Sequence, residues 1–183
     1  MKKDLQEKLE NEFSFMKRDK AKTPTIYQQW SCECGSGWFD LLFSLFTEVS
    51  EAYAKAGIEP DITIQQIKEK FGTLRVYASF SSSDCNLHAI DFLNIATGIR
   101  FAPENDTGDD TLNKVHKEVM NIIKNYEEKS RHTCEVCSAE GILRRELPWI
   151  QVLCDSCLKD YYDKKSQRQL EKKRLIDEFK DNS

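Results

Sequence analysis

Residues 134–157 carry two pairs of cysteines in the pattern C-x2-C-x16-C-x2-C, and this pattern limits the fold more than any other feature. Two thiolates that are two residues apart can hold one metal ion, and a second such pair completes a tetrahedral site. A segment of about 25 residues buries too little apolar surface to fold alone, so a bound ion takes the place of a core. We therefore predict one structural zinc ion, in preference to redox-active cysteines or an iron–sulfur cluster, on four ligands: Cys134, Cys137, Cys154 and Cys157.

The residues around these cysteines predict the order of elements in the zinc module. The first pair lies on a turn, short strands around 142–143 and 150–153 form a hairpin, and the second pair leads into a sequence of helical composition. This order is typical of a treble clef, with a zinc ribbon as the alternative. HNH-type nucleases also contain treble clefs, but they need catalytic histidines and no histidine follows His132. Four thiolates leave no position for substrate water, so the ion is expected to be structural.

The chain has seven cysteines, and this odd count argues against a fully paired disulfide framework. The N-terminus lacks the apolar segment of a secretory signal and no stretch is apolar enough to span a membrane, so we expect a cytoplasmic protein. Cys32 and Cys34 form C-x-C, and Cys85 with His88 forms C-x2-H; together they are an acceptable second set of zinc ligands. These pairs are far apart in the sequence, so we favour buried free thiols and an ordinary histidine.

Apolar periodicity predicts an α+β main domain over residues 1–130, followed by the zinc module and a charged C-terminal helix over 131–183. Gly57 is placed to end the core helix, and Gly72 to make the turn of a hairpin. A two-stranded hairpin is unstable alone, so it must pack on helices or recruit further strands. The expected elements are a helix over 2–17, a loop over 18–31, the core helix over 38–57, an antiparallel hairpin over 62–80, and helices over 86–99 and 110–130.

Charge is distributed unevenly along the chain. The formal net charge is −4, of which residues 1–130 contribute −5 and residues 131–183 contribute +1. The overall acidity argues against a protein that coats DNA. A basic run in the last helix could still follow the phosphates of a nucleic acid, although a solvated helix face is the commoner meaning of such a run. The run consists of Lys164, Lys165, Arg168, Lys172, Lys173 and Arg174.

The segment C-G-S-G-W over 34–38 precedes the core helix and suggests an anion-binding or partner-binding surface. Ser36 and Gly37 would expose backbone N–H groups at a helix N-terminus, where the macrodipole favours negative charge. Positive charge near the hairpin tip could add to this surface, from Lys68, Lys70 and Arg75. The alternative, which we favour, is that Ser36 caps the helix, the glycines make the turn and Trp38 fills the core, because no phosphate-loop signature follows.

No catalytic constellation is evident in the sequence. His88, His116 and His132 have no serine, cysteine or acidic partner in a recognisable motif. Nothing marks Cys85 as a nucleophile either. The chain is therefore expected to act without enzymatic activity.

Three segments together resemble a group of small, largely uncharacterised zinc-binding proteins encoded by bacteriophages, prophages and some bacteria. The segments are C-G-S-G-W-F-D-L-L over 34–42, I-K-E-K-F-G-T-L-R-V-Y over 67–77, and the double C-x2-C over 134–157. The resemblance implies phage origin and brings no established activity. By analogy, small non-enzymatic phage proteins commonly bind, redirect or block a host protein, including components of anti-phage defence.

These observations lead to three functional hypotheses. The leading one is a non-enzymatic, zinc-stabilised phage accessory factor that binds and inhibits or redirects a host protein. The second is a nucleic-acid-binding zinc-finger protein that uses the basic C-terminal helix. The third is a binder of a small phosphorylated or nucleotide signal at the surface formed by the C-G-S-G-W segment and the hairpin tip.

Overall fold

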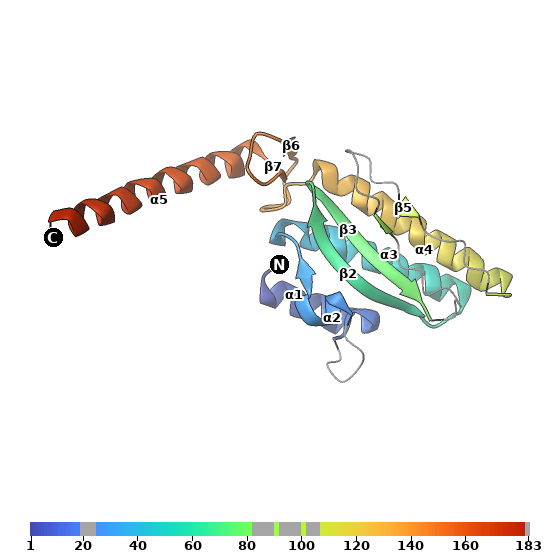
Figure 1. Ribbon diagram of the computed structural model, residues 1–183. Helices are drawn as coiled ribbons and strands as arrows, with labels where there is room; N and C mark the ends of the chain where they lie inside the picture. Colours follow the sequence, from blue (N-terminus) through green and yellow to red (C-terminus); the bar gives the residue numbers. More distant parts are fainter. Residues whose placement is uncertain (19–24, 82–89, 92–99, 102–106, 182–183) are drawn as a thin grey trace.

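The computed structural model describes residues 1–18, 25–81, 90–91, 100–101 and 107–181 and confirms the expected α+β class. A layer of helices packs on a small sheet, and a four-cysteine module with a long terminal helix follows (Figure 1). The main elements in chain order are α1 (Lys3–Glu12), α2 (Ile26–Trp30), β1 (Cys32–Glu33), α3 (Phe39–Ala56), β2 (Ile62–Lys70), β3 (Thr73–Phe80), β4 (Ile90–Asp91), β5 (Arg100–Phe101), α4 (Asp110–Lys129), β6 (Ile142–Arg144), β7 (Gln151–Leu153) and α5 (Asp155–Asp181). Short 3-10 turns cover Ser14–Met16 (η1), Ser36–Trp38 (η2) and Ser130–His132 (η3).

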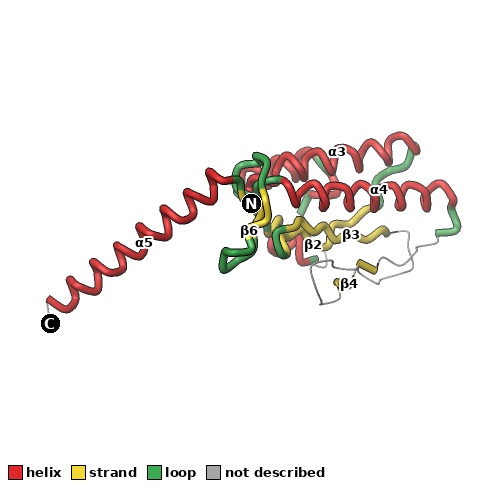
Figure 2. Tube along the Cα trace, turned by 90° about the horizontal axis from the view of Figure 1, so that it is seen from above, coloured by secondary structure: helices red, strands yellow, loops and turns green. Residues whose placement is uncertain are grey.

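Helices α3 and α4 lie side by side on one face of the β2–β3 hairpin (Figure 2). Gly57 ends α3 as predicted: its φ of 69° is left-handed, and its N–H donates to carbonyl oxygens of the last turn. Asp109 begins α4, because its side chain accepts hydrogen bonds from the backbone N–H groups of Thr111 and Leu112. Both helix ends were therefore encoded by local capping chemistry.

The central sheet has three strands in the order β1-β2-β3. Strands β2 and β3 form the predicted antiparallel hairpin, and its two-residue turn is Phe71-Gly72, with φ of 53° and 72°. Positive φ at both positions matches the turn that suits the twist of a tight hairpin. Strand β1 adds to β2 in parallel, with Cys32 opposite Ile67. The hairpin thus both recruits a strand and packs on helices.

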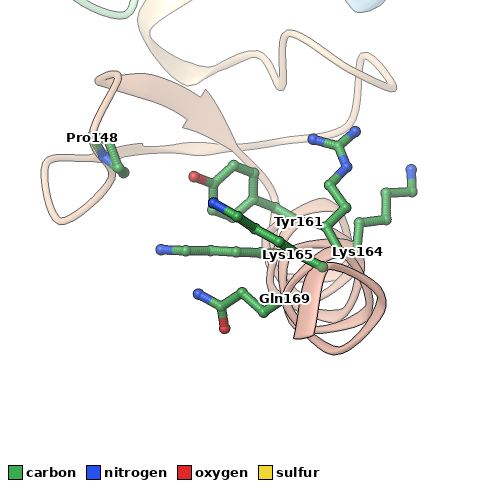
Figure 3. A pocket seen from close by; sticks show the side chains of 7 residues that line it. Pro148, Tyr161, Lys164, Lys165 and Gln169 are labelled. Carbon is green, nitrogen blue, oxygen red and sulfur yellow. The ribbon is translucent and has the colours of Figure 1, made fainter. Parts of the chain in front are cut away.

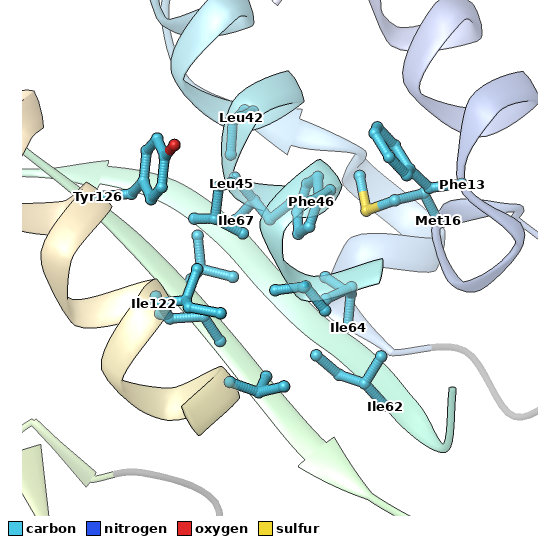
Figure 4. Close-up of a cluster of buried hydrophobic side chains, with 14 of the residues drawn as sticks. Phe13, Met16, Leu42, Leu45, Phe46, Ile62, Ile64, Ile67, Ile122 and Tyr126 are labelled. Carbon is cyan, nitrogen blue, oxygen red and sulfur yellow. The ribbon is translucent and has the colours of Figure 1, made fainter. Parts of the chain in front are cut away.

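The hydrophobic core lies between the sheet and the helices, with the α1–η1 segment closing one side (Figure 4). The predicted helical stripes supply it: Leu9, Phe13 and Met16 come from the N-terminal segment. Strands and the two long helices supply the rest, including Trp38, Leu42, Leu45, Phe46, Val49, Tyr53, Ile62, Ile64, Ile67, Leu74, Val76, Val119, Ile122, Ile123 and Tyr126.

The outer edge of β3 is covered by side chains from the end of α4. The N–H of Leu74 donates to Ser130 Oγ over 2.9 Å, and the N–H of Val76 donates to Glu127 Oε1 over 2.8 Å. Arg75 lies 3.8 Å from the other Glu127 carboxylate oxygen. These side chains occupy ladder positions that an additional strand would otherwise take.

Three predictions of secondary structure need correction. The helix expected over 2–17 ends at Glu12 and is followed by a 3-10 turn, and the loop expected over 18–31 contains α2. Helix α2 is five residues long and is capped by Thr25, so it is too short to show apolar periodicity. The helix expected over 86–99 is wrong at Ile90–Asp91, which form a strand paired with Arg100–Phe101; short apolar runs do not distinguish the two structures. The rest of that segment lies outside the described residues.

Helix α5 extends away from the rest of the protein as a single rod (Figure 1). It has 27 residues, and every residue from 162 to 179 is exposed. Among the described residues, no helix is both long and apolar enough to cross a membrane.

Candidate metal centre and its junction with the main domain

The four predicted ligands lie together in space. The thiols of Cys134, Cys137, Cys154 and Cys157 are all within 4.8 Å of one another. The Sγ atoms of Cys137 and Cys154 are 3.6 Å apart, close to the edge of about 3.8 Å of a tetrahedron with metal–sulfur bonds of about 2.3 Å. This separation is far longer than a disulfide bond, and all four cysteines are free. The arrangement can hold one metal ion.

Local structure brings the two cysteine pairs together. The first pair lies on a turn, where the N–H of Ser138 donates to the carbonyl of Cys134, and Ser138 adopts a left-handed φ of 68°. Strands β6 and β7 form an antiparallel hairpin that returns the chain to the second pair. Helix α5 then starts at Asp155, so Cys157 lies in its first turn. Knuckle, hairpin and ligand-bearing helix follow the predicted treble-clef order.

Hydrogen bonds favour the thiolate form of Cys154. The N–H of Cys157 donates to Cys154 Sγ over 3.4 Å and lowers the pKa of the Cys154 thiol to about 7. The pKa of Cys157 is raised, because burial and the neighbouring thiols disfavour a second negative charge. A cation at the centre of the cluster would remove this repulsion, since thiolates are the form that binds metal.

The apolar cluster around the cysteines is small. Leu147 and Leu153 are its buried aliphatic side chains, and Leu158 and Tyr161 from α5 pack against it in part. So little apolar surface cannot hold a hairpin and a helix together. The donor set and the small core therefore fit a structural ion that is held by the four cysteines.

The C-G-S-G-W segment docks directly on the first cysteine pair. The N–H of Gly35 donates to Glu135 Oε1 and the N–H of Gly37 donates to the Glu135 carbonyl, each over 2.8 Å. The indole N–H of Trp38 donates to Thr133 O over 2.8 Å. The contact is so close that a Cβ atom on Gly37 would lie 2.4 Å from the carbonyl oxygen of Cys134. The glycines are thus required by the packing of the knuckle.

The tip of the β2–β3 hairpin docks on the same module. A Cβ atom at Gly72 would lie 2.2 Å from a methyl carbon of Leu143, in β6. On the rim, the indole N–H of Trp149 donates to Glu69 Oε2 over 2.7 Å. The three segments at 34–42, 67–77 and 134–157 therefore meet at one place, which we call the junction. Hydrogen bonds cross the boundary between the two expected domains.

The residues of the expected anion surface have internal partners. The N–H of Gly37 binds Glu135, and Ser36 Oγ accepts a hydrogen bond from the N–H of Lys2. Arg75 lies beside Glu127 at the covered edge of β3. Lys68 and Lys70 lie on the hairpin, with their ammonium groups 5.0 Å from the Tyr77 ring centroid and 6.0 Å from that of Phe71, respectively. The Gly35 amide thus meets the carboxylate of the protein's own Glu135, and the Gly37 amide meets the Glu135 carbonyl.

Cys32 and Cys34 are buried in and beside β1. Their carbonyl oxygens accept hydrogen bonds from the amino group of Met1, over 3.1 and 2.6 Å. Burial raises the pKa of the Cys34 thiol to about 12 and that of Cys32 well above its ordinary value. Burial and a raised pKa are what we expected of Cys32 and Cys34 as buried free thiols. The other members of the expected second zinc site, Cys85 and His88, lie outside the described residues.

Four of the six residues in the predicted basic run share a groove on α5 (Figure 3). The groove has a volume of about 350 Å³ and is lined by Pro148, Tyr161, Lys164, Lys165, Arg168, Gln169 and Lys172. The other two residues do not line it. Arg174 pairs with Glu171 and Glu178, at 2.9 and 3.5 Å, and Lys173 is exposed.

Two features of the structure could not be read from motifs. Glu135 and Trp149 act at the junction, and only their positions, within the first cysteine pair and between the two pairs, hint at a role. A buried network joins His116 to Asp61, with Nε2 3.0 Å from Oδ1, and Tyr53 donates to the same oxygen over 2.7 Å. His116 also stacks on Phe80, with ring centroids 3.8 Å apart. This network ties α3 and α4 to the start of β2.

Comparison with known proteins returns no protein-family model, no curated protein and no solved structure that matches the chain. The site is therefore interpreted from its own geometry.

Proposed function

We propose that this chain is a zinc-stabilised, non-enzymatic interaction protein that binds another macromolecule through α5. The ion in the four-cysteine cluster is zinc in this proposal, because four thiolates in a tetrahedral arrangement are its preferred structural ligands. The ion fixes the direction in which α5 leaves the junction, since Cys157 belongs to the helix. The metal thereby holds the start of α5 in one orientation relative to the junction.

The observation that carries the proposal is the exposure of α5. Isolated helices have only marginal stability in water, and most helices in proteins are stabilised by packing of an apolar face. Here residues 162–179 are all exposed, and they include large apolar side chains near the end of the helix. Those side chains are Leu170, Leu175, Ile176 and Phe179. A partner that covers Leu175, Ile176 and Phe179 would supply the missing packing.

The nature of the partner follows from the resemblance of the three junction segments to phage-encoded proteins. On that basis the chain is a phage accessory factor that acts in the cytoplasm of the host, and its partner is a host protein, with anti-phage defence components as the class to examine first. A binding protein without catalytic activity would inhibit or redirect this partner by occupying its surface.

The test is affinity capture from a bacterial host lysate, with variants that alter α5 alone. We expect one stoichiometric protein to be captured by the wild-type chain and lost with the triple variant L175A/I176A/F179A. L170A is the control, because Leu170 is also an exposed apolar residue of α5 and lies on another side of the helix. Alanine preserves helix propensity in each variant. Capture that is absent, or that is unchanged in the triple variant, would contradict the proposal.

A second candidate function is nucleic-acid binding, and the basic groove on α5 favours it. Lys165, Arg168 and Lys172 recur at helical spacing with Tyr161, so four side chains face one groove. Lysine and arginine can contact phosphates there while the tyrosine ring stacks on a base.

This candidate makes a quantitative prediction about salt. The four cations that line the groove, Lys164, Lys165, Arg168 and Lys172, could make four phosphate contacts, which give a slope of log K against log salt on the order of −3 for a single strand. We expect K165A/R168A to weaken binding of single-stranded RNA or DNA and to flatten the slope, whereas K159A/K173A removes the same charge from another side of α5 and has a small effect. A flat salt response of the wild-type chain, or equal effects of both double variants, would exclude this function.

A further inference from the structure

A second cavity lies at the junction, away from the basic groove. Its volume is about 450 Å³, and its walls come from the edge of the β1–β2 pair, the cysteine knuckle and the loop before β7. Glu33, Gln66, Lys68, Glu69, Glu135 and Trp149 line it. Three segments that are distant in the sequence thus combine to form one pocket.

Negative charge dominates this pocket. Three carboxylates line it against one ammonium group, that of Lys68, which lies over the Tyr77 ring. The other nearby cation is the amino group of Met1, which donates to the carbonyl oxygens of Cys32 and Cys34 and is not part of the cavity wall. The pocket is therefore suited to a cation.

One carboxylate oxygen in the wall has no partner. Glu135 is only 5% exposed; its Oε1 accepts the N–H of Gly35, but its Oε2 is buried and has no hydrogen bond among the described residues. A buried acceptor that lacks a partner is destabilising, and a bound donor would satisfy it. Glu33, which also lines the pocket, offers further acceptor capacity, because within the described part of the chain it receives one hydrogen bond, from the Gln66 amide over 3.0 Å.

Trp149 adds an aromatic side chain to the lining of the pocket. The residue is 65% exposed, yet its indole is oriented by the hydrogen bond to Glu69. An aromatic face beside carboxylates is the usual environment of a bound guanidinium group, which stacks on the ring and donates to several acceptors in its plane. A lysine ammonium would satisfy fewer acceptors at fixed geometry.

We propose that the junction pocket binds the guanidinium group of an arginine side chain from a protein partner. The arginine donates to Glu135 Oε2 and to Glu33, and its plane packs against Trp149. The inference rests on the proposed function, since it supposes a protein partner, and it adds a basic segment as the chemistry of that partner. The pocket and the apolar end of α5 then recognise different parts of it.

The test is a titration of the metal-loaded, full-length protein with the peptide acetyl-Gly-Arg-Gly-amide, followed by nuclear magnetic resonance at the indole N–H of Trp149. The W149F variant assigns that signal. We expect a saturable shift with the arginine peptide, no shift with the citrulline analogue, and weaker binding with the lysine analogue. A shift with calcium chloride that arginine does not reproduce, or an equal shift with citrulline, would overturn the proposal.

Two variants examine the carboxylates separately. Glu135→Gln should weaken arginine binding at least tenfold, with Glu140→Gln as the control on an exposed residue of the same module. Glu33→Gln should weaken it severalfold, and because Glu33 is exposed this variant remains informative if Glu135→Gln does not fold. The proposal would be contradicted if Glu33→Gln, and also Glu135→Gln where it folds, bound the arginine peptide with wild-type affinity. The L175A/I176A/F179A variant should retain the arginine response, so failure of the α5 hypothesis is distinguishable from failure of this one.

Discussion

At the scale of single residues, Gly37 shows how closely the main domain and the metal module approach each other. A Cβ atom at this position would lie 2.4 Å from Cys134 O and 2.7 Å from the N atom of Cys137, both of which are backbone atoms. Backbone cannot move aside as a flexible side chain can, so we expect Gly37→Ala to lower the free energy of unfolding by at least about 2 kcal/mol. Chemical denaturation monitored by circular dichroism measures this change.

The matched control for Gly37→Ala is Ser36→Ala. Ser36 is the neighbouring residue, and its side chain makes an exposed hydrogen bond to the N–H of Lys2. Loss of that bond should lower the free energy of unfolding by less than about 1 kcal/mol. Equal effects of the two substitutions would show that the close contact at Gly37 is not structurally important.

The thiol of Cys34 makes a prediction about pH. Burial raises its pKa to about 12, so the folded state favours the protonated thiol and only about one molecule in ten thousand carries the thiolate at pH 8. The thiolate is the reactive form, and the side chain is also shielded from reagents. We therefore expect Cys32 and Cys34 to resist iodoacetamide from pH 7 to pH 9 in the folded protein, and to react readily in urea.

Peptide mass spectrometry after alkylation measures the modification at each cysteine. Above pH 9 the free energy of unfolding falls as the pH rises. The Cys34 thiol ionises at a lower pH in the unfolded state than in the folded state, so its ionisation draws the equilibrium toward the unfolded state. Rapid modification of Cys34 in folded protein at pH 8 would mean that this segment opens far more often than its burial indicates.

At the scale of elements, the cysteine cluster holds the β6–β7 hairpin and the start of α5 together. Cys154→Ser replaces one of the four clustered thiols, which can hold a metal ion, by a hydroxyl, which is a poor zinc ligand. We expect the bound zinc to fall from one ion per chain to a small fraction, and the module to lose on the order of 4 kcal/mol of stability. Inductively coupled plasma mass spectrometry measures the metal.

Hydrogen exchange shows how far this loss extends. Amides of residues 134–157 should lose protection in Cys154→Ser, whereas those of α3 and α4 should keep it, because the main core does not depend on the ion. Ser156→Ala is the control, since Ser156 is exposed between the two ligands of the second pair. A full zinc complement in Cys154→Ser would exclude Cys154 as a ligand.

At the scale of the whole molecule, we expect stability to depend on residues 1–161 and binding to depend on the exposed part of α5. The core lies in residues 1–130 and the junction adds the metal module, whereas residues 162–179 of α5 are all exposed. Deletion of residues 163–183 should therefore change the free energy of unfolding by less than about 1 kcal/mol, while it abolishes capture of the partner. Parallel denaturation and capture experiments measure the two effects, and a large loss of stability would show that α5 packs on the body.

Much of the fold was predictable because its signals are local. Helix α3 was evident from apolar spacing and from Gly57, the hairpin from its turn at Gly72, and α4 as a helix over 110–130. Helix α2 and strand β4 were missed, since an element of five residues or fewer has no measurable period. The His116–Asp61 pair was missed because its members are 55 residues apart.

The sequence by itself predicted which four cysteines lie together, since two C-x2-C pairs have the spacing that a tetrahedral metal site requires, and their thiols are within 4.8 Å of one another. Only the tertiary structure decided what the C-G-S-G-W segment does. Its amides suit an anion, as helix N-termini do, but the fold supplies Glu135 of the knuckle as that anion from 100 residues away. The residue types determine which groups can donate or accept a hydrogen bond. Which group becomes the hydrogen-bond partner depends on which distant segments the core brings within hydrogen-bonding distance.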